Sequence, residues 1–152
     1  MINRILGSVF MGLMFVSILD FLYFIGLKLN YFDFYKIDVY FNVLFFDNQN
    51  FYILLPLSFV VGYMTMYSKL AKQFLKIYVL VIIFSAITLY EPIGKSLGEI
   101  VFLQDNQRFK FGSTTFSGST LYEGRTTIYI YRNDLAKTIK LAKEKVKNIT
   151  VQ

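Results

Sequence analysis

The sequence predicts an α-helical membrane protein with three transmembrane helices and a small α+β extramembrane domain, an antiparallel β-meander with one C-terminal helix. Of the 152 residues, 55% are hydrophobic and only 17% are charged, whereas soluble domains are about a quarter charged. The apolar excess is concentrated in three long runs in the first part of the chain. The later part alternates between apolar and polar residues, which is typical of strands.

The first apolar run, residues 5–27, carries a single charge at Asp20. At about 1.5 Å per residue it is roughly 34 Å long, enough for a hydrocarbon core of about 30 Å. Arg4 precedes the run, as in a signal peptide, but the run is longer than the apolar region of a signal peptide. We therefore expect residues 1–30 to form an uncleaved transmembrane helix.

The second and third runs, residues 51–67 and 74–90, are separated by a short connection with Lys69, Lys72 and no acid. They predict a transmembrane helical hairpin within residues 51–94. A buried soluble helix is the alternative for either run, but one small domain could not cover three apolar helices. Because basic loops stay in the cytoplasm, we expect a cytoplasmic N-terminus and a C-terminal domain on the outer side.

Residues 31–50 form an extramembrane loop between the first two runs. Apolar and polar residues alternate through residues 35–43, which predicts a half-buried strand. An interfacial helix is the alternative, but the charges do not gather on one helical face. Two crossings separate this loop from the C-terminal domain, so both lie on one side of the membrane. We therefore expect residues 35–43 to join the C-terminal sheet.

Residues 95–152 predict a β-meander followed by a basic amphipathic helix. One hairpin is expected from residues 100–111 around a turn at 104–107, and a second from residues 114–132 around a turn at 123–125. Gly112 and Gly118 suggest a bend or bulge. In the last strand the pattern places Thr127, Tyr129 and Tyr131 on one face and Ile128 and Ile130 on the other. Apolar residues at helical spacing predict a helix over residues 134–147. The expected interior of the domain formed by the loop, the sheet and this helix holds Ile37, Val39, Phe41, Phe109, Phe111, Ile128, Ile130, Leu135 and Ile139.

Asp20 is the candidate intramembrane polar site. It lies about seven residues, roughly 10 Å, inside the far end of the first run, where a carboxylate is costly unless it is paired or hydrated. One interpretation is an ion, proton or subunit-pairing site. The other is an acid near the interface that reaches toward Lys28 or Asn30.

Two further sets of residues are candidates for contacts. Small residues four apart let transmembrane helices approach closely. The first run carries one such pair, Ser8 with Gly12, and the second run carries another, Ser58 with Gly62. They favour packing of the first two runs on each other, or of one run on a partner. The lysines of the basic helix are candidates for contacts with anionic lipid or an acidic protein, and the alternative is an ordinary solvated face. The candidate residues are Lys137, Lys140, Lys143 and Lys147.

The sequence offers no catalytic, cofactor-binding or metal-binding motif, because Cys and His are both absent and no ionisable groups converge. We therefore expect a non-enzymatic accessory or scaffold subunit of a membrane complex that serves secretion, a motor, conjugation or envelope assembly. A compact transport, channel or toxin-immunity protein acting through Asp20 is the alternative. The richness in Phe, Ile, Lys and Tyr suggests a bacterial inner membrane. Expected partners are lipids and other membrane or envelope proteins, without nucleic acid, and a homo-oligomer remains open.

Overall fold

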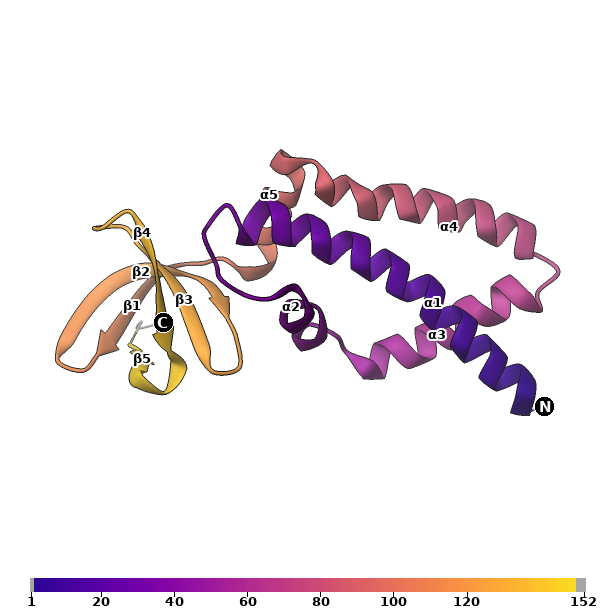
Figure 1. The fold of residues 1–152 in the computed structure, drawn as a ribbon, viewed down its shortest axis with the longest axis horizontal. Helices are drawn as coiled ribbons and strands as arrows, with labels where there is room; N and C mark the ends of the chain where they lie inside the picture. Colours follow the sequence, from indigo (N-terminus) through magenta and orange to yellow (C-terminus); the bar gives the residue numbers. More distant parts are fainter. Residues whose placement is uncertain (1, 150–152) are drawn as a thin grey trace.

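A computed structural model describes residues 2–149 and shows an elongated molecule, with helices at one end and a β-sheet at the other (Figure 1). Helices occupy all three apolar runs: α1 (Ile2–Leu27), α3 (Phe51–Met66) and α4 (Ala71–Ala86). A π-helical turn, η1 (Lys28–Phe32), extends α1, and a 3-10 turn, η2 (Ile87–Leu89), extends α4. Both extended helices are long and apolar enough to cross a membrane.

The helix α3 reaches that length only together with the short helix α2 (Phe41–Asp47), from which it is bent by 86°. The break lies at residues 48–50. There the Asn50 side chain caps α3, because its oxygen accepts a hydrogen bond of 3.0 Å from the Tyr52 backbone N–H. The structure therefore contains two or three helical segments suited to span a bilayer.

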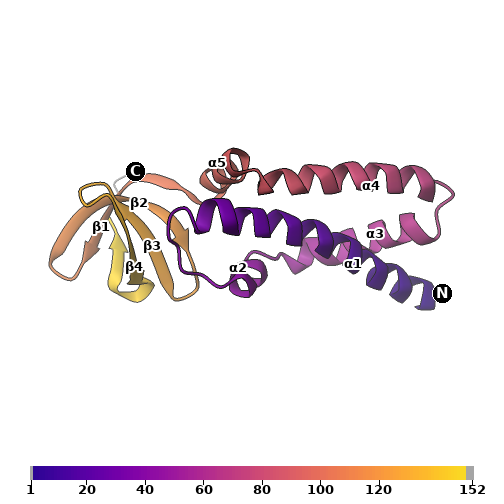
Figure 2. The same cartoon turned by 45° about the horizontal axis from the view of Figure 1, so that its top comes forward.

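The long helices lie along the long axis of the molecule, with α3 antiparallel to both α1 and α4 (Figure 1). The N-terminus and the connection between α3 and α4 lie at the end far from the sheet, while the α1–α2 loop lies beside the sheet (Figures 1 and 2). A further helix, α5 (Glu91–Phe102), follows η2 and lies across the sheet-proximal end of the helices. Its chain then continues directly into the sheet.

The C-terminal sheet has five antiparallel strands in the order β4-β3-β2-β1-β5. The strands are β1 (Gln104–Phe111), β2 (Thr114–Glu123), β3 (Thr127–Arg132), β4 (Lys137–Ala142) and β5 (Val146–Asn148). A three-residue 3-10 turn, η3 (Lys143–Lys145), joins β4 to β5, although these strands lie on opposite edges. Such a short connection requires the sheet to curl, as Figure 1 shows.

The predicted second hairpin is confirmed. Strands β2 and β3 pair antiparallel around the turn, where Gly124 N–H donates to the Thr127 carbonyl at 2.8 Å. The two faces of β3 are also as predicted. Tyr129 and Tyr131 pack in one apolar cluster, and Ile128 and Ile130 pack in another on the opposite face. Gly112 adopts a φ of 60° in the β1–β2 turn, a conformation that suits glycine.

The predicted strand over residues 35–43 is wrong. Residues 37–40 pair with no strand, and α2 begins at Phe41. The loop does not add to the sheet edge. It packs its apolar side chains, among them Ile37, onto one face of the sheet. The alternation reflects this one-sided burial, which an irregular segment can achieve as well as a strand.

The predicted first hairpin is also wrong. Residues 100–102 end α5, and residues 104–107, expected to be a turn, begin strand β1. Two features of α5 are visible in the sequence. Pro92 lies at the start of the helix, where its missing N–H costs nothing. Gly94 and Gly98 are four apart, and both are buried against neighbouring segments.

The predicted C-terminal helix is replaced by β4, η3 and β5. The helical spacing left out Leu141, which together with Ile139 follows the two-residue period of a strand. Both residues pack in the apolar cluster of Ile128 and Ile130, opposite which they lie in register. Pairing with β3 therefore overrides the helical pattern. Two residues of the expected interior, Phe111 and Leu135, are exposed.

Candidate functional site

The four small residues of the candidate helix-packing set lie together where α1 crosses α3, and all four are buried. A Cβ on Gly12 would lie 1.6 Å from the Ser58 carbonyl oxygen, and one on Gly62 would lie 1.8 Å from the Ser8 carbonyl oxygen. The backbones therefore touch directly, and only glycine fits at these two positions. We refer to these four residues as the crossing.

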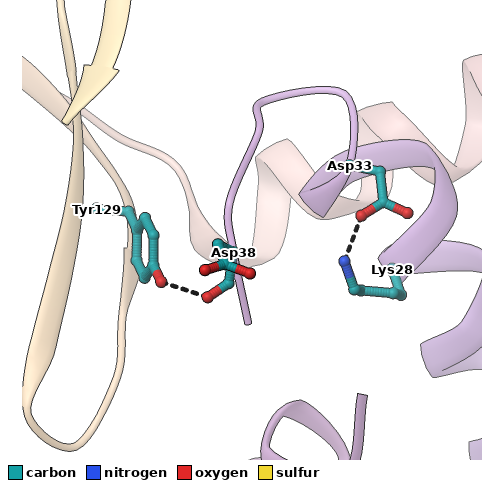
Figure 3. Close-up of polar contacts among 4 residues, drawn as sticks. All are labelled: Lys28, Asp33, Asp38 and Tyr129. Carbon is teal, nitrogen blue, oxygen red and sulfur yellow. Dashed lines mark hydrogen bonds and ion pairs between the residues drawn. The ribbon is translucent and has the colours of Figure 1, made fainter. Parts of the chain in front are cut away.

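Asp20 lies on α1 beside the break between α2 and α3, where its side chain is hydrogen-bonded to Gln49. Neither partner expected from the sequence is used. Lys28 forms an ion pair with Asp33 (Figure 3), and Asn30 donates to the Thr88 carbonyl oxygen at 2.8 Å. Asp20 is half-buried. Its contact with Gln49 places it beside the point where the second apolar segment changes direction.

The four candidate lysines do not share a helical face, because their segment forms strands. Lys140 Nζ lies 3.8 Å from a carboxylate oxygen of Asp38, and Lys143 Nζ lies 2.5 Å from one of Glu123. Lys147 sits on β5 opposite Lys110. Lys137, at the start of β4, borders a cavity between the β3–β4 turn and the loop that joins η1 to α2, residues 33–40, which we call the first loop. The structure therefore separates the set into members of different surfaces.

The largest apolar cluster joins the end of α1 to the sheet, and we call it the junction. Its buried members come from α1, η1, the first loop, α2, β2 and β3: Phe24, Leu27, Tyr31, Phe32, Ile37, Leu44, Leu121, Tyr122 and Tyr129. The aromatic rings meet mainly edge to face, with Phe32 and Tyr122 centroids 5.1 Å apart. Two stretches that are distant in the sequence, residues 24–44 and residues 121–129, thus share one core.

Hydrogen bonds fix the register of the junction. The Tyr31 hydroxyl donates to the Leu121 carbonyl at 2.8 Å, and the Tyr129 hydroxyl donates to the Asp38 carbonyl at 2.5 Å (Figure 3). Thr138 on β4 donates to the Tyr35 carbonyl at 2.7 Å. The first loop is not a strand, so its backbone carbonyls cannot pair with a neighbouring strand. Two of them instead accept hydrogen bonds from side chains of the sheet.

Helix α5 packs closely against η1 and the loop that follows it. A Cβ on Gly98 would lie 2.3 Å from the Tyr31 ring, so only glycine allows this approach. The Tyr35 hydroxyl donates to Glu99 at 2.7 Å. Burial, followed by this hydrogen bond, raises the pKa of the Tyr35 hydroxyl above its usual range. The helix end, α5 and the sheet are therefore a single packed unit.

The contacts described above position the helices and the sheet relative to one another. Among residues 2–149, no three His, Cys, Asp or Glu side chains converge on a point that could hold a metal ion. Sequence reasoning missed Tyr31, Leu121 and Gly98 as organising residues. The buried pair Gly94 and Gly98 is a signal that could have identified α5 as a close-packed helix. Comparisons with protein-family models, curated proteins and solved structures find no match for this chain.

Proposed function

We propose that this chain is a non-enzymatic scaffold or accessory subunit of a bacterial inner-membrane complex, which crosses the bilayer three times and presents its β-domain on the outer face. The observation that carries the proposal is the junction. Its buried core joins α1 and η1 to β2 and β3 without a flexible linker. A domain held in this way keeps a fixed height and orientation relative to the bilayer, which is what a docking platform requires.

The charge distribution supports the proposed orientation. Arg4, Lys69 and Lys72 gather at the end of the helices far from the sheet, and basic ends stay in the cytoplasm. The broad apolar surface of the helices supports membrane embedding, since side chains such as Leu80 and Phe84 on α4 are 65% and 76% exposed. Water would penalise such a surface, whereas lipid does not.

Single cysteines test the crossing number, because the natural chain has none. Lys110→Cys on β1 and Lys69→Cys beside α4 are both exposed positions. We expect a membrane-impermeant maleimide to label the first in intact spheroplasts and the second only after lysis. Labelling of both from the same side would contradict three crossings, and the reverse pattern would invert the orientation.

Purification in gentle detergent tests the scaffold role. We expect the full chain to recover the same membrane or envelope proteins in fixed stoichiometry, as measured by quantitative mass spectrometry. Asp20→Asn should recover the same set, because Asp20 contacts this chain's own Gln49. A single homogeneous species without partners would contradict the proposal.

A transport, channel or toxin-immunity protein acting through Asp20 is the second candidate. It is favoured by one observation, the contact of this acid with the break between α2 and α3. Broken helices line ion paths in many membrane proteins. Ion or proton flux into vesicles containing the purified chain, abolished by Asp20→Asn with unchanged folding, would select this function over the scaffold.

A further inference from the structure

A cavity of about 600 Å³ lies between the first loop and the β3–β4 turn, lined by residues that include Phe34, Tyr35 and Tyr131. A second cavity of about 380 Å³ shares these three side chains and continues toward the α5–β1 connection. Together they form one groove, which we call the aromatic groove. Phe34 is 50% exposed and Leu135 is 56% exposed along it, so part of its wall is apolar and accessible.

The rim of the aromatic groove is basic. Lys36 and Lys137 border it, and both are exposed. Neither ammonium group has an ion-pair partner among residues 2–149, whereas Lys140 and Lys143 each have one. A third cation, Lys95 on α5, lies 3.7 Å from the centre of the Phe34 ring and pairs with Glu99 at 4.0 Å. Three nearby acids have partners within the chain: Asp33 pairs with Lys28, Asp134 pairs with Arg132, and Glu99 accepts a hydrogen bond from Tyr35. A fourth acid, Asp105, lines the far part of the groove.

The backbone is strained on both sides of the aromatic groove. Lys36 has a φ of 56° and Ala136 a φ of 47°, and both residues border the same cavity. Residues with a side chain rarely adopt this region, and they keep it only where the contacts around them hold the backbone in place. Here the two turns place Lys36 and Lys137 at the border of the same cavity.

The position of the groove relative to the helices identifies its occupant. Lys28 is the first charge after the apolar run of α1, and Phe34 follows six residues later. The π-helical turn η1 and the turn after it lie between these two residues, so the groove lies just beyond the apolar part of α1. In the proposed placement this is the headgroup layer of a bilayer, which is about 5–8 Å deep on each side. A cleft with aromatic walls and unpaired lysines at this depth meets phosphate groups and the adjacent glycerol region of lipids.

We propose that the aromatic groove binds the headgroup of an anionic phospholipid, with Lys36 and Lys137 contacting the phosphate and Phe34 and Leu135 contacting its apolar part. The inference rests on the proposed membrane placement. It assigns to one lysine of the C-terminal segment, Lys137, a lipid contact, and withholds that role from Lys140 and Lys143, which are paired within the chain. Bound lipid would stabilise the orientation of the β-domain that the junction sets.

The absence of tryptophan from the natural chain allows a direct test. Leu135→Trp places a single fluorophore in the groove of the full chain, reconstituted in phosphatidylcholine vesicles that contain phosphatidylglycerol. We expect a headgroup-attached nitroxide to quench it at least severalfold more strongly on phosphatidylglycerol than on phosphatidylcholine at equal mole fraction. The double variant Lys36→Gln, Lys137→Gln should remove this preference. The matched control Lys110→Gln, Lys147→Gln removes the same charge from β1 and β5 and should retain it.

Equal quenching by both labelled lipids, or an unchanged preference in the Lys36 and Lys137 variant, would overturn the proposal. Loss of the preference on adding inorganic phosphate at low concentration would overturn it as well, because the site would then belong to a soluble ligand. Phe84→Trp on α4, paired with an acyl-chain quencher, tests membrane placement separately. Without quenching at Phe84 the membrane proposal fails, whereas quenching there without a preference at Leu135 removes only the groove.

Discussion

The crossing and the junction are both tightly packed, but they are built in opposite ways. At the crossing, Gly12 and Gly62 bring two helix backbones into direct contact, and the partner groups are the carbonyls of Ser58 and Ser8. At the junction, large rings fill the space between segments, and backbones stay apart. The crossing therefore depends on the absence of side-chain atoms at Gly12 and Gly62, whereas the junction depends on large side chains that fill its core.

This difference determines how each region responds to change. A close backbone contact cannot adapt to added atoms, because neither partner is a movable side chain. An aromatic core loses stability when atoms are removed, but its rings and loop can partly collapse into the space. The crossing should therefore be sensitive to enlargement, and the junction to truncation.

Enlargement at the crossing gives the largest expected effect. Gly12→Val places a Cβ 1.6 Å from the Ser58 carbonyl oxygen, so α1 and α3 must separate along their contact. We expect a loss of about 3 kcal/mol, at the upper end for overpacking, measured by thermal unfolding in detergent. Gly7→Val is the matched control on the same helix, where the nearest atom, the Tyr67 hydroxyl, would be 3.4 Å away. Equal losses in both variants would show that the crossing has no special role.

Truncation at the junction gives the next effect. Ile37 is only 1% exposed and packs beneath the sheet. Ile37→Ala should cost about 2 kcal/mol, the lower end for such a deletion, because an irregular loop can settle into the space. Limited proteolysis should detect faster cleavage within residues 33–40. Leu135→Ala, at a side chain that is 56% exposed, serves as control, and equal protection of the loop in both variants would contradict the role of Ile37.

The same contrast explains which parts of the fold could be predicted. Apolar length identified all three helical runs, and the spacing of Ser8, Gly12, Ser58 and Gly62 named residues that the structure brings together. The alternation of Tyr129 with Ile128 and Ile130 predicted the two faces of β3. Each of these patterns is local, so a single sequence contains it.

The remaining errors arose where distant contacts decide. Residues 137–142 have both helical and strand periodicity, and pairing with β3 selects the strand. The Tyr35–Val43 pattern predicted the burial of Ile37, but Val43 at its end is 41% exposed. Burial on a sheet face also does not require strand pairing. Tyr31 gave no signal, because its partner Leu121 lies 90 residues further along the chain.

A single hydrogen bond at the junction should have a smaller effect. Tyr129→Phe keeps the ring in the core but leaves the Asp38 carbonyl without the hydroxyl that reaches it at 2.5 Å. We expect a loss of about 1 kcal/mol, the usual net value for one hydrogen bond. Hydrogen exchange of the amides within residues 37–40 should increase. Tyr40→Phe, on a ring that is 78% exposed, should leave both measurements unchanged, and an unchanged exchange rate in Tyr129→Phe would refute the contact.

The smallest expected effect depends on pH and concerns the link between the junction and α5. Burial and the hydrogen bond to Glu99 raise the pKa of Tyr35, so the folded protein favours the neutral phenol. This contribution to stability is complete below the ordinary tyrosine pKa of about 10 and is lost as the pH rises toward the raised folded value. Near neutral pH, Tyr35→Phe should therefore lower the free energy of unfolding by about 1 kcal/mol or less and unfold at a lower temperature than the natural chain. Above about pH 10 the two melting curves should converge, and a difference that stays constant across this range would separate Tyr35 from the alkaline loss of stability.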